Sequence, residues 1–565
     1  MAELTKQELI ELDSRIDSAI LSQGLFDFNQ DVAAIHLLRF FEDYARLHAL
    51  TRPASIKVEA YTSMLKAGQD GMHFAINWVY QHCPSPIRRM QLDLQVSAYV
   101  QSGLLHEAAM RYSGVWDLMA MLQRGRAVAE SDRDGVVRVR FTNPEAEDVE
   151  VASQFVAHSD NPDSQEELDE LASEMHPERF LGEVPIRSDR QGGIKYFIPD
   201  EVFEHVAECQ RQILSSKWEL DGTWDVGGYT LAQFRDFWTA LLTFCWIHQW
   251  ACMRSGVKGG ALNSVVKMRH RDGWVEDLAR RCALDASIIR LIIDDLTYEP
   301  ALYSPGRKQP DVVTQPFFPL RHQLLALSNQ LALLSNAERN LWDLVSIKRP
   351  EIHSVLRNMK EELWLRQLTP RLEEYGLRVF GPIKFSHAGR RSDLDLLILD
   401  RESRFGLGCQ LKWLTSPDRI RDVSYADNEL LKGIAQAALS LEWLNSRPGK
   451  LEELTRLTAE ELADVEFRAA VLSKNTIGSA WTYRPGIPII SERLTDWIVG
   501  RPHQRSLRTL WQVGDERRYM PQRGKHFVDE DAVVEFGGVR FVGERMSMRV
   551  ITAWDPVEDI NFSGL

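Results

Sequence analysis

Cysteine is scarce in this sequence and shows no regular spacing. The 565 residues include six cysteines, none of them in a Cys-X-X-Cys pair. Small secreted domains depend on dense, paired cysteines, so a disulfide framework is excluded and the thiols are expected to be reduced. Cys245, His248 and Cys252 lie at helical spacing, which a zinc site could use, but the Trp and Phe residues around them favour a buried apolar helix face. The cysteine content therefore indicates a protein of the reducing cytoplasm.

Long uninterrupted hydrophobic runs are also missing. The most apolar stretch, Leu231–Met253, contains Arg235, Asp236 and His248, and the N-terminal segment carries acidic residues where a secretory signal would be apolar. A membrane-spanning helix needs about 20 predominantly apolar residues. We therefore expect a buried helix over 231–253 and a cytoplasmic protein that has no membrane partner.

Positive charge is in deficit, and two common nucleotide and hydrolase motifs are absent. The chain has 67 Lys and Arg against 81 Asp and Glu, a net charge of -14. Proteins that coat nucleic acid through bulk charge are basic, so that class is excluded, although a locally basic surface is not. The sequence contains no GxxxxGK[ST] phosphate loop and no GxSxG nucleophile turn, which argues against a P-loop motor and an α/β-hydrolase.

The residues that are present predict a multidomain chain with a helical beginning and an α/β end. Hydrophobic residues make up 44% of the sequence, as in ordinary globular proteins, and at about 150 residues per domain the length suggests three or four domains. Helical spacing of apolar residues predicts helical domains over 1–155 and 200–344. Between them, 156–199 reads as an acidic linker with a short irregular or β segment. Residues 345–500 alternate helices and strands, and 501–565 are expected to be a β-rich extension of that domain.

Residues 274–296 have the pattern of a helix-turn-helix. Asp285 would cap the second helix. A recognition helix in a DNA groove is one interpretation, and a plain helical hairpin is the other. The second helix offers Arg290 against Asp294 and Asp295, a poor match to phosphate, so the plain hairpin is favoured.

The α/β segment has a definite order of expected elements. We expect a helix over 351–375 that ends at Gly376. Strands are expected over 377–385, 394–399 and 405–413, followed by a helix over 428–445 and short buried strands over 467–473 and 487–491.

Three polar residues in this segment carry a recognisable chemistry. Asp395 opens the second expected strand, and Gln410 and Lys412, two residues apart on the third, share one face of the sheet. If the two strands form a hairpin, a carboxylate, an amide oxygen and an ammonium group converge. Oxygen ligands suit a hard cation such as Mg²⁺, and a lysine can serve the attacking water in phosphodiester hydrolysis.

Asp395, Gln410, Leu411 and Lys412 resemble the motif of the PD-(D/E)XK, or restriction-endonuclease-like, nuclease superfamily. The order of elements in 345–500 resembles the core of that family as well. The resemblance implies a restriction-endonuclease-like α/β domain, nuclease activity and Mg²⁺ as cofactor, with Mn²⁺ as a substitute. Gln410 stands where many members have Glu, which lowers the charge that holds the metal; members resembling the Mrr-type nucleases carry Gln there. A nuclease-like fold without activity, acting as a nucleic-acid-binding or scaffold protein, is the alternative.

The resemblance also implies supporting residues. The family places an acid on the preceding helix, where Glu361 and Glu362 are candidates and Glu362 is slightly favoured. Asp393 is a candidate auxiliary acid. Gln436 and Lys432, on the helix after the lysine, are candidates for contact with the nucleic-acid backbone.

The charge around the motif differs from that of the whole chain. Residues 376–425 carry nine basic and six acidic residues, and Arg390 and Arg391 lie next to the candidate site. A basic rim on an acidic protein fits a nuclease that binds nucleic acid at one face. We therefore expect nucleic acid as partner, with DNA favoured over RNA, while protein partners and a homo-oligomer stay open.

The size of the N-terminal region suggests a regulated enzyme. A nuclease core of about 150 residues does not need some 340 more to fold. We expect residues 1–340 to sense or restrain, in a bacterial defence or genome-maintenance system. The acidic stretch 160–174 could cover the basic rim, although a solvated loop is the favoured interpretation.

Overall fold

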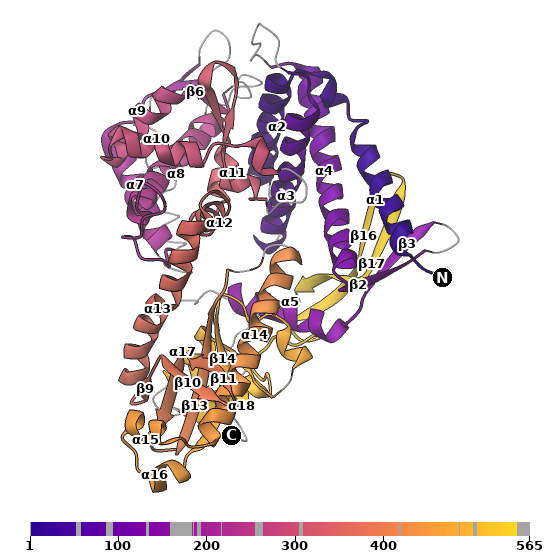
Figure 1. Cartoon of the computed structure of the whole chain (residues 1–565). Coiled ribbons are helices and arrows are strands. Elements are labelled where there is room, and N and C mark those ends of the chain that lie inside the picture. Colours follow the sequence, from indigo (N-terminus) through magenta and orange to yellow (C-terminus); the bar gives the residue numbers. More distant parts are fainter. Residues whose placement is uncertain are drawn as a thin grey trace.

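The computed structural model has a helical N-terminal region and a C-terminal region that contains a five-stranded mixed sheet (Figure 1). It describes residues 2–51, 58–85, 94–131, 135–158, 184, 186–188, 194–215, 217–254, 264–303, 309–415, 417, 420–484, 486–500 and 506–550. The acidic stretch 160–174 lies outside the described residues. Within these ranges no helix is long and apolar enough to cross a membrane.

The first part of the chain is a group of long helices. They are α1 (Lys6–Ile20), α2 (Gln30–Thr51), α3 (Val58–His82) and α4 (Val96–Gln123). The side chains of Thr5 and Glu8 form a reciprocal capping box that starts α1. The buried faces of α2, α3 and α4 meet in one core, which includes Leu38, Phe41 and Ile76.

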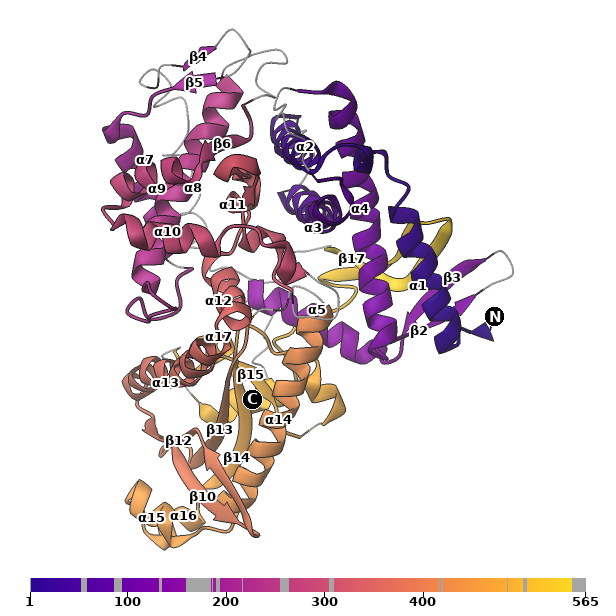
Figure 2. The same ribbon diagram turned by 45° about the horizontal axis from the view of Figure 1, so that its top comes forward.

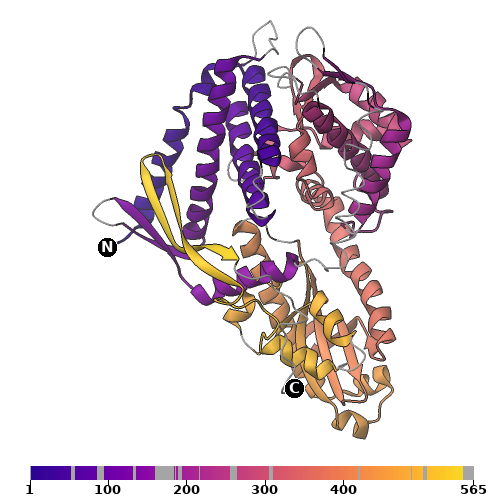
Figure 3. The ribbon, with the colours of Figure 1, turned by 180° about the vertical axis from the view of Figure 1, so that it is seen from behind.

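A five-stranded sheet lies beside these helices and contains both ends of the described chain. Its order is β1 (Ala2–Glu3), β2 (Ala127–Ser131), β3 (Val136–Phe141), β17 (Val539–Val550) and β16 (Phe527–Phe536). We expected residues 501–565 to be a β-rich extension of the α/β segment. The helix Leu507–Asp515 does pack on that sheet, but β17 pairs in parallel with β3, and Figure 3 shows the yellow hairpin beside the N-terminal helices. The alternation of apolar and polar side chains predicts that a segment is a strand, but it does not predict which strand it pairs with. The sequence therefore did not predict the pairing of β17 with β3.

The middle of the chain is again helical. It contains α5 (Pro144–His158), α7 (Asp200–Ser215), α8 (Leu231–Arg254), α9 (Arg271–Cys282), α10 (Ala286–Asp295), α11 (Asn329–Leu333) and α12 (Ala337–Lys348). The short strands of this part are β4 (Ile186–Ser188), β5 (Ile194–Tyr196), β6 (Lys267–His270), β7 (Phe317–Pro319) and β8 (Leu324–Leu327), and its 3-10 turns lie at 300–303, 312–314 and 321–323. Two further 3-10 turns lie outside it, at 24–27 and 480–483. The expected helix over 231–253 is α8, and most of its side chains are buried.

The helix-turn-helix pattern forms a helical hairpin. The side chain of Asp285 accepts a hydrogen bond from the Ser287 backbone N–H and caps α10 as expected. The Arg290 guanidinium donates to the carboxylate of Asp272 at 3.0 Å, on α9. The one basic side chain of α10 is therefore paired within the hairpin.

The C-terminal α/β part begins with α13 (Pro350–Glu374), after which Gly376 adopts φ 83°. Its mixed sheet has the order β15 (Ile489–Ser491), β14 (Glu466–Lys474), β13 (Phe405–Trp413), β12 (Leu396–Asp400) and β9 (Arg378–Phe380). Strands β13, β14 and β15 are parallel, whereas β12 is antiparallel to both β13 and β9. The long helix α14 (Ile420–Asn445) packs along β13 and β14 (Figure 2). The remaining helices are α15 (Gly449–Thr455), α16 (Ala459–Ala463), α17 (Glu492–Val499) and α18 (Leu507–Asp515).

Two of the expected strands, 377–385 and 394–399, are each divided between two observed strands. The expected strand 377–385 forms β9 and then β10 (Ile383–His387), which leaves the main sheet and pairs with β11 (Arg390–Leu394). Asp395 follows β11 directly, and β12 starts at the next residue. The chain thus changes partners at Asp395, which places this residue at the corner between the hairpin and the sheet.

The α/β part shares its core with the middle helices. One continuous cluster of buried residues contains Trp238 of α8 and Trp274 of α9 as well as Trp364 of α13 and Leu411 of β13. A second, smaller cluster fills the space between the β10–β11 hairpin, α14 and α15. The main sheet therefore packs in one continuous core with the middle helices and is not a separately packed unit.

Candidate active site

Asp395 is fixed by the backbone of the neighbouring strand. Its Oδ2 accepts a hydrogen bond of 2.8 Å from the backbone N–H of Leu411. Gly381, in the turn before β10, comes so close that an added Cβ would lie 2.2 Å from the carbonyl oxygen of Asp395. The corner is therefore closed on both sides, with the carboxylate between the positions of Gln410 and Lys412.

Gln410 is buried beside this corner. Its side chain is 1% exposed, and Nε2 donates a hydrogen bond of 2.8 Å to the backbone carbonyl of Asp393. Because the amide nitrogen is held in this way, the side-chain orientation is set, and Oε1 remains as the acceptor of that group.

Lys412 runs past a glycine of α14. A Cβ at Gly433 would lie 3.1 Å from Lys412 Cε and 3.3 Å from Val471 Cγ1. Glycine in the middle of a helix costs about 1 kcal/mol relative to alanine. Its presence here leaves the space in which the lysine stem lies between the sheet and α14.

Carboxylates gather around the corner. Burial raises the pKa of Asp395 to about 6, while the Leu411 N–H and the Lys412 charge act to lower it. The negative charges of Asp393 and Glu361 raise the pKa of Asp395 further. Three acids and one lysine thus interact within a partly buried site, and a bound cation would stabilise the ionised carboxylates.

Of the two glutamates on α13, Glu361 is the one near the site. Both side chains are exposed, but Glu361 lines one cavity of about 400 Å³ together with Lys412, and Glu362 does not line it. The sequence slightly favoured Glu362. The family resemblance was compatible with either residue and did not decide between them.

The other candidates lie at the rim. Arg390 and Arg391 are exposed on β11, and Arg391 lines an open hollow with Lys384, Lys450 and Asp393. This hollow brings three cations next to the candidate site, two of which the sequence reasoning did not single out.

The candidates on α14 have different surroundings. The ammonium group of Lys432 is exposed and donates a hydrogen bond of 2.6 Å to Glu429. Gln436 lies one turn further along and is partly buried. Lys432 is thus paired on its own helix, and Gln436 lies closer to the body of the protein.

The donor set suits magnesium better than zinc. The described residues contain no group of three or more His, Cys, Asp or Glu side chains arranged to hold a metal. Asp395, Glu361 and the Gln410 amide offer oxygens, which a six-coordinate Mg²⁺ with several water ligands can use. The alternative zinc residue His248 accepts or donates a hydrogen bond of 2.7 Å with the Tyr196 hydroxyl inside the core.

Several residues at the site could not be found from the sequence. Trp413, next to Lys412, donates its indole N–H to Glu219 at 3.1 Å, across 194 residues of sequence. Gly381 lies next to Asp395 and Gly433 next to Lys412 only because the fold brings these distant segments together. A short motif contains no signal for such long-range contacts.

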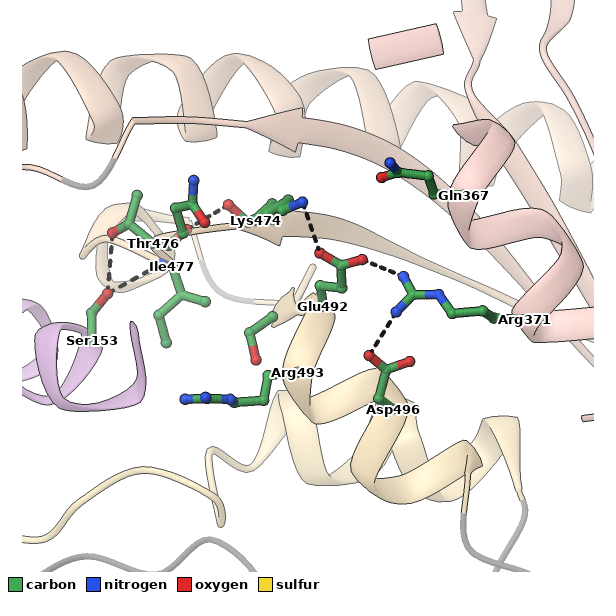
Figure 4. A pocket seen from close by; sticks show the side chains of 12 residues that line it. Ser153, Gln367, Arg371, Lys474, Thr476, Ile477, Glu492, Arg493 and Asp496 are labelled. Atoms are coloured by element: carbon green, nitrogen blue, oxygen red, sulfur yellow. Dashed lines mark hydrogen bonds and ion pairs between the residues drawn. The ribbon is translucent and has the colours of Figure 1, made fainter. Parts of the chain in front are cut away.

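A second cavity, of about 640 Å³, lies at the carboxyl ends of β14 and β15 (Figure 4). Arg371 pairs there with Glu492 and, at 3.0 Å, with Asp496, while Lys474 lies 3.8 Å from Glu492. Ser153 reaches in from α5 and accepts hydrogen bonds from the backbone N–H groups that follow β14. The hydrogen bonds of Ser153 join α5 to the sheet, and the cavity shares no lining residue with the Asp395 site.

Comparisons with known proteins gave no match: no family model, no curated protein and no solved structure is similar to this chain.

Proposed function

We propose that the C-terminal α/β part is a metal-dependent nuclease that hydrolyses phosphodiester bonds, with DNA favoured as substrate. The observation that carries the proposal is the convergence of Asp395, Gln410 and Lys412 at the corner where β12 begins beside β13. A carboxylate, an amide oxygen and an ammonium group held by backbone hydrogen bonds are the components that this reaction needs.

Each residue has a distinct role in this proposal. Asp395, Gln410 and Glu361 would hold Mg²⁺, which when bound polarises the scissile phosphate and lowers the pKa of its water. Lys412 orients the attacking water and balances the negative charge that develops on the phosphate oxygens. Arg391, in the hollow on the other side of Asp393, would contact the nucleic-acid backbone without reading its sequence.

The resemblance to the PD-(D/E)XK superfamily supports this proposal through the order of elements. A helix, antiparallel strands that carry the motif, a second helix and a further parallel strand follow one another in α13, β12–β13, α14 and β14. This is the order expected from the motif. Defence or genome maintenance, with the helical region as sensor or restraint, is the setting we propose for it.

A nuclease-like fold without activity is the second candidate. The neutral Gln410 and the lack of a preformed group of three acidic, His or Cys ligands among the described residues favour it. Metal binding separates the two: the active enzyme gains thermal stability with Mg²⁺ or Mn²⁺, and the inactive fold does not.

A matched pair of variants on α13 tests the proposal. On α13 the pair is Glu361→Gln and Glu362→Gln, and Asp395→Asn is the third variant. We expect Asp395→Asn and Glu361→Gln each to lower the rate of Mg²⁺-dependent DNA cleavage by about 100-fold or more, because each removes a charge from the metal site. Glu362→Gln, one residue away and exposed, should leave the rate unchanged. Parent-like cleavage by Asp395→Asn would rule out the assignment.

A further inference from the structure

The cavity that Lys412 and Glu361 line is a chamber between four elements. Its walls come from Trp342 of α12, Lys360 of α13, Trp413 of β13 and Tyr425 of α14. Its volume is about 400 Å³. Small-molecule sites in proteins start at about 300 Å³, so the chamber has room for one nucleotide but not for a base pair with its two backbones.

Lys360 forms the most buried cationic part of this chamber. Its side chain is 7% exposed, and Nζ lies 5.0 Å from the ring centre of Trp342 and 4.8 Å from that of Trp413. Among the described residues no carboxylate lies within ion-pair distance of it. Buried charges are normally paired, whereas the carboxylates of Glu219 and Asp343 act on this cation only from beyond ion-pair distance, so Lys360 has two indole faces but no direct anionic contact.

Two of the four acids that line the chamber pair with basic side chains. Glu429 pairs with Arg357 at 3.3 Å and with Lys432 at 2.6 Å, and Asp422 lies 3.9 Å from Arg339. The charges of these two carboxylates are therefore compensated, that of Glu429 in part by Arg357, which also lines the chamber. An anion that enters the chamber meets Lys360 and Lys412, two cations that form no ion pair with a carboxylate of the described residues.

An aromatic ring is available at the rim. Tyr425 is 53% exposed and lines the same chamber. Exposed aromatic rings beside cations are the elements that bind single-stranded nucleic acid, because every base has a face that can stack on them.

We propose that this chamber, the Lys360 chamber, receives one unpaired nucleotide of the substrate strand, with its phosphate toward Lys360 and Lys412 and its base against Tyr425. The inference rests on the proposed nuclease function and adds its substrate class. The site then acts on single strands and unpaired ends in preference to intact duplex, because helices α12 and α14 stand on both sides of the nucleotide.

Binding in Ca²⁺, which supports coordination with slow or no cleavage, tests this directly. Fluorescence anisotropy should show that the full-length protein binds a labelled single-stranded oligonucleotide at least ten times more tightly than a blunt duplex of the same sequence. Tyr425→Ala and Lys360→Met should each weaken single-strand binding about tenfold or more. Tyr483→Ala, which removes an exposed tyrosine outside the chamber, is the matched control and should bind like the parent.

The outcomes separate this inference from the nuclease proposal. Equal binding of duplex and single strand, or parent-like binding by both chamber variants with parent-like melting temperatures, overturns the chamber assignment even if Asp395→Asn abolishes cleavage. Weakened binding by the chamber variants supports the assignment even if no cleavage is found, and in that case the nuclease proposal alone fails. Lys360→Met removes a buried charge and keeps the side-chain length, so its melting temperature is expected to match that of the parent or exceed it.

Discussion

Two glycines decide where the chemical groups of the candidate site lie. Gly381 allows the turn before β10 to contact the backbone of Asp395, and Gly433 allows the stem of Lys412 to pass α14. The spacing of Asp395, Gln410 and Lys412 could be predicted because alternation on a strand is a local property. The glycines could not be assigned a role, because each contacts a residue that is distant in the sequence.

Gly433→Ala should separate stability from activity. Alanine favours the helix by about 1 kcal/mol, but its Cβ would lie 3.1 Å from Lys412 Cε and displace the lysine. We expect an unchanged or higher melting temperature and a cleavage rate lowered about tenfold or more. Ala435→Gly, at an exposed position of the same helix, is the control for helix propensity and should lower stability without affecting the chemistry.

Gly381→Ala should damage both properties. The new Cβ would lie 2.2 Å from the Asp395 carbonyl oxygen, so the turn or the corner has to move. We expect a loss of about 1–3 kcal/mol in the free energy of unfolding, measured by denaturant titration, together with weaker Mg²⁺ binding. Gly389→Ala, in the β10–β11 turn with no atom near its Cβ position, controls for the positive φ alone.

At the scale of elements, the breaks in strands and the burial of a lysine were the features that sequence patterns did not predict. Strand β13 was predicted residue for residue, since nearly all of its side chains are buried. The expected strand 377–385 is split between β9 and β10, because a continuous apolar pattern does not reveal a change of partner. On α13, Lys360 is buried in the same row as Leu356 and Trp364, a position that an apolar pattern does not predict for a lysine.

The junction between α2 and α11 should make stability depend on pH. Glu42 of α2 accepts hydrogen bonds from the Ser328 hydroxyl and the Gln330 N–H, and burial raises the pKa of Glu42 to about 7. The folded chain therefore holds one more proton than the unfolded chain between pH 4.5 and 7, so this contribution to stability is present below pH 4.5 and is lost as the pH rises through 7. At most it amounts to about 3 kcal/mol.

Glu42→Gln should remove that dependence. We expect the difference between the melting temperature of Glu42→Gln and that of the parent to shift steadily in favour of the variant from pH 5 to pH 8. Glu374→Gln, at an exposed position of α13, should follow the parent at every pH. A constant difference between Glu42→Gln and the parent across this range would contradict the shifted ionisation.

At the scale of the whole molecule, the N-terminal helical part, the middle helical part and the α/β part make direct contacts with one another, in addition to following one another along the chain. Strand β17 pairs with β3, Trp413 donates to Glu219, and the Arg126 guanidinium lies 3.2 Å from the carboxylate of Asp427 on α14. The order of helical and α/β segments was predictable from periodicity. Their contacts were not, because pairing across hundreds of residues has no local pattern.

A fragment of residues 345–565 should therefore not keep the stability of the full chain. It loses β3 as partner of β17 and exposes the side of the common core that the middle helices cover. We expect a single cooperative melting transition for the full chain and a broadened transition at lower temperature for the fragment, measured by circular dichroism. A fragment that melts as sharply and as high as the full chain would show that the α/β part is independent.

The dependence of cleavage rate on Mg²⁺ concentration, measured on single-stranded DNA for the parent and Lys412→Met, tests the nuclease assignment most directly. Lys412 is assigned to the attacking water and the phosphate, while Asp395, Gln410 and Glu361 are assigned to the metal. We predict a maximal rate at least about 100-fold lower for Lys412→Met, with half-saturation at nearly the same Mg²⁺ concentration as the parent. The same maximal rate in both proteins, or cleavage that does not depend on Mg²⁺, would contradict the assignment.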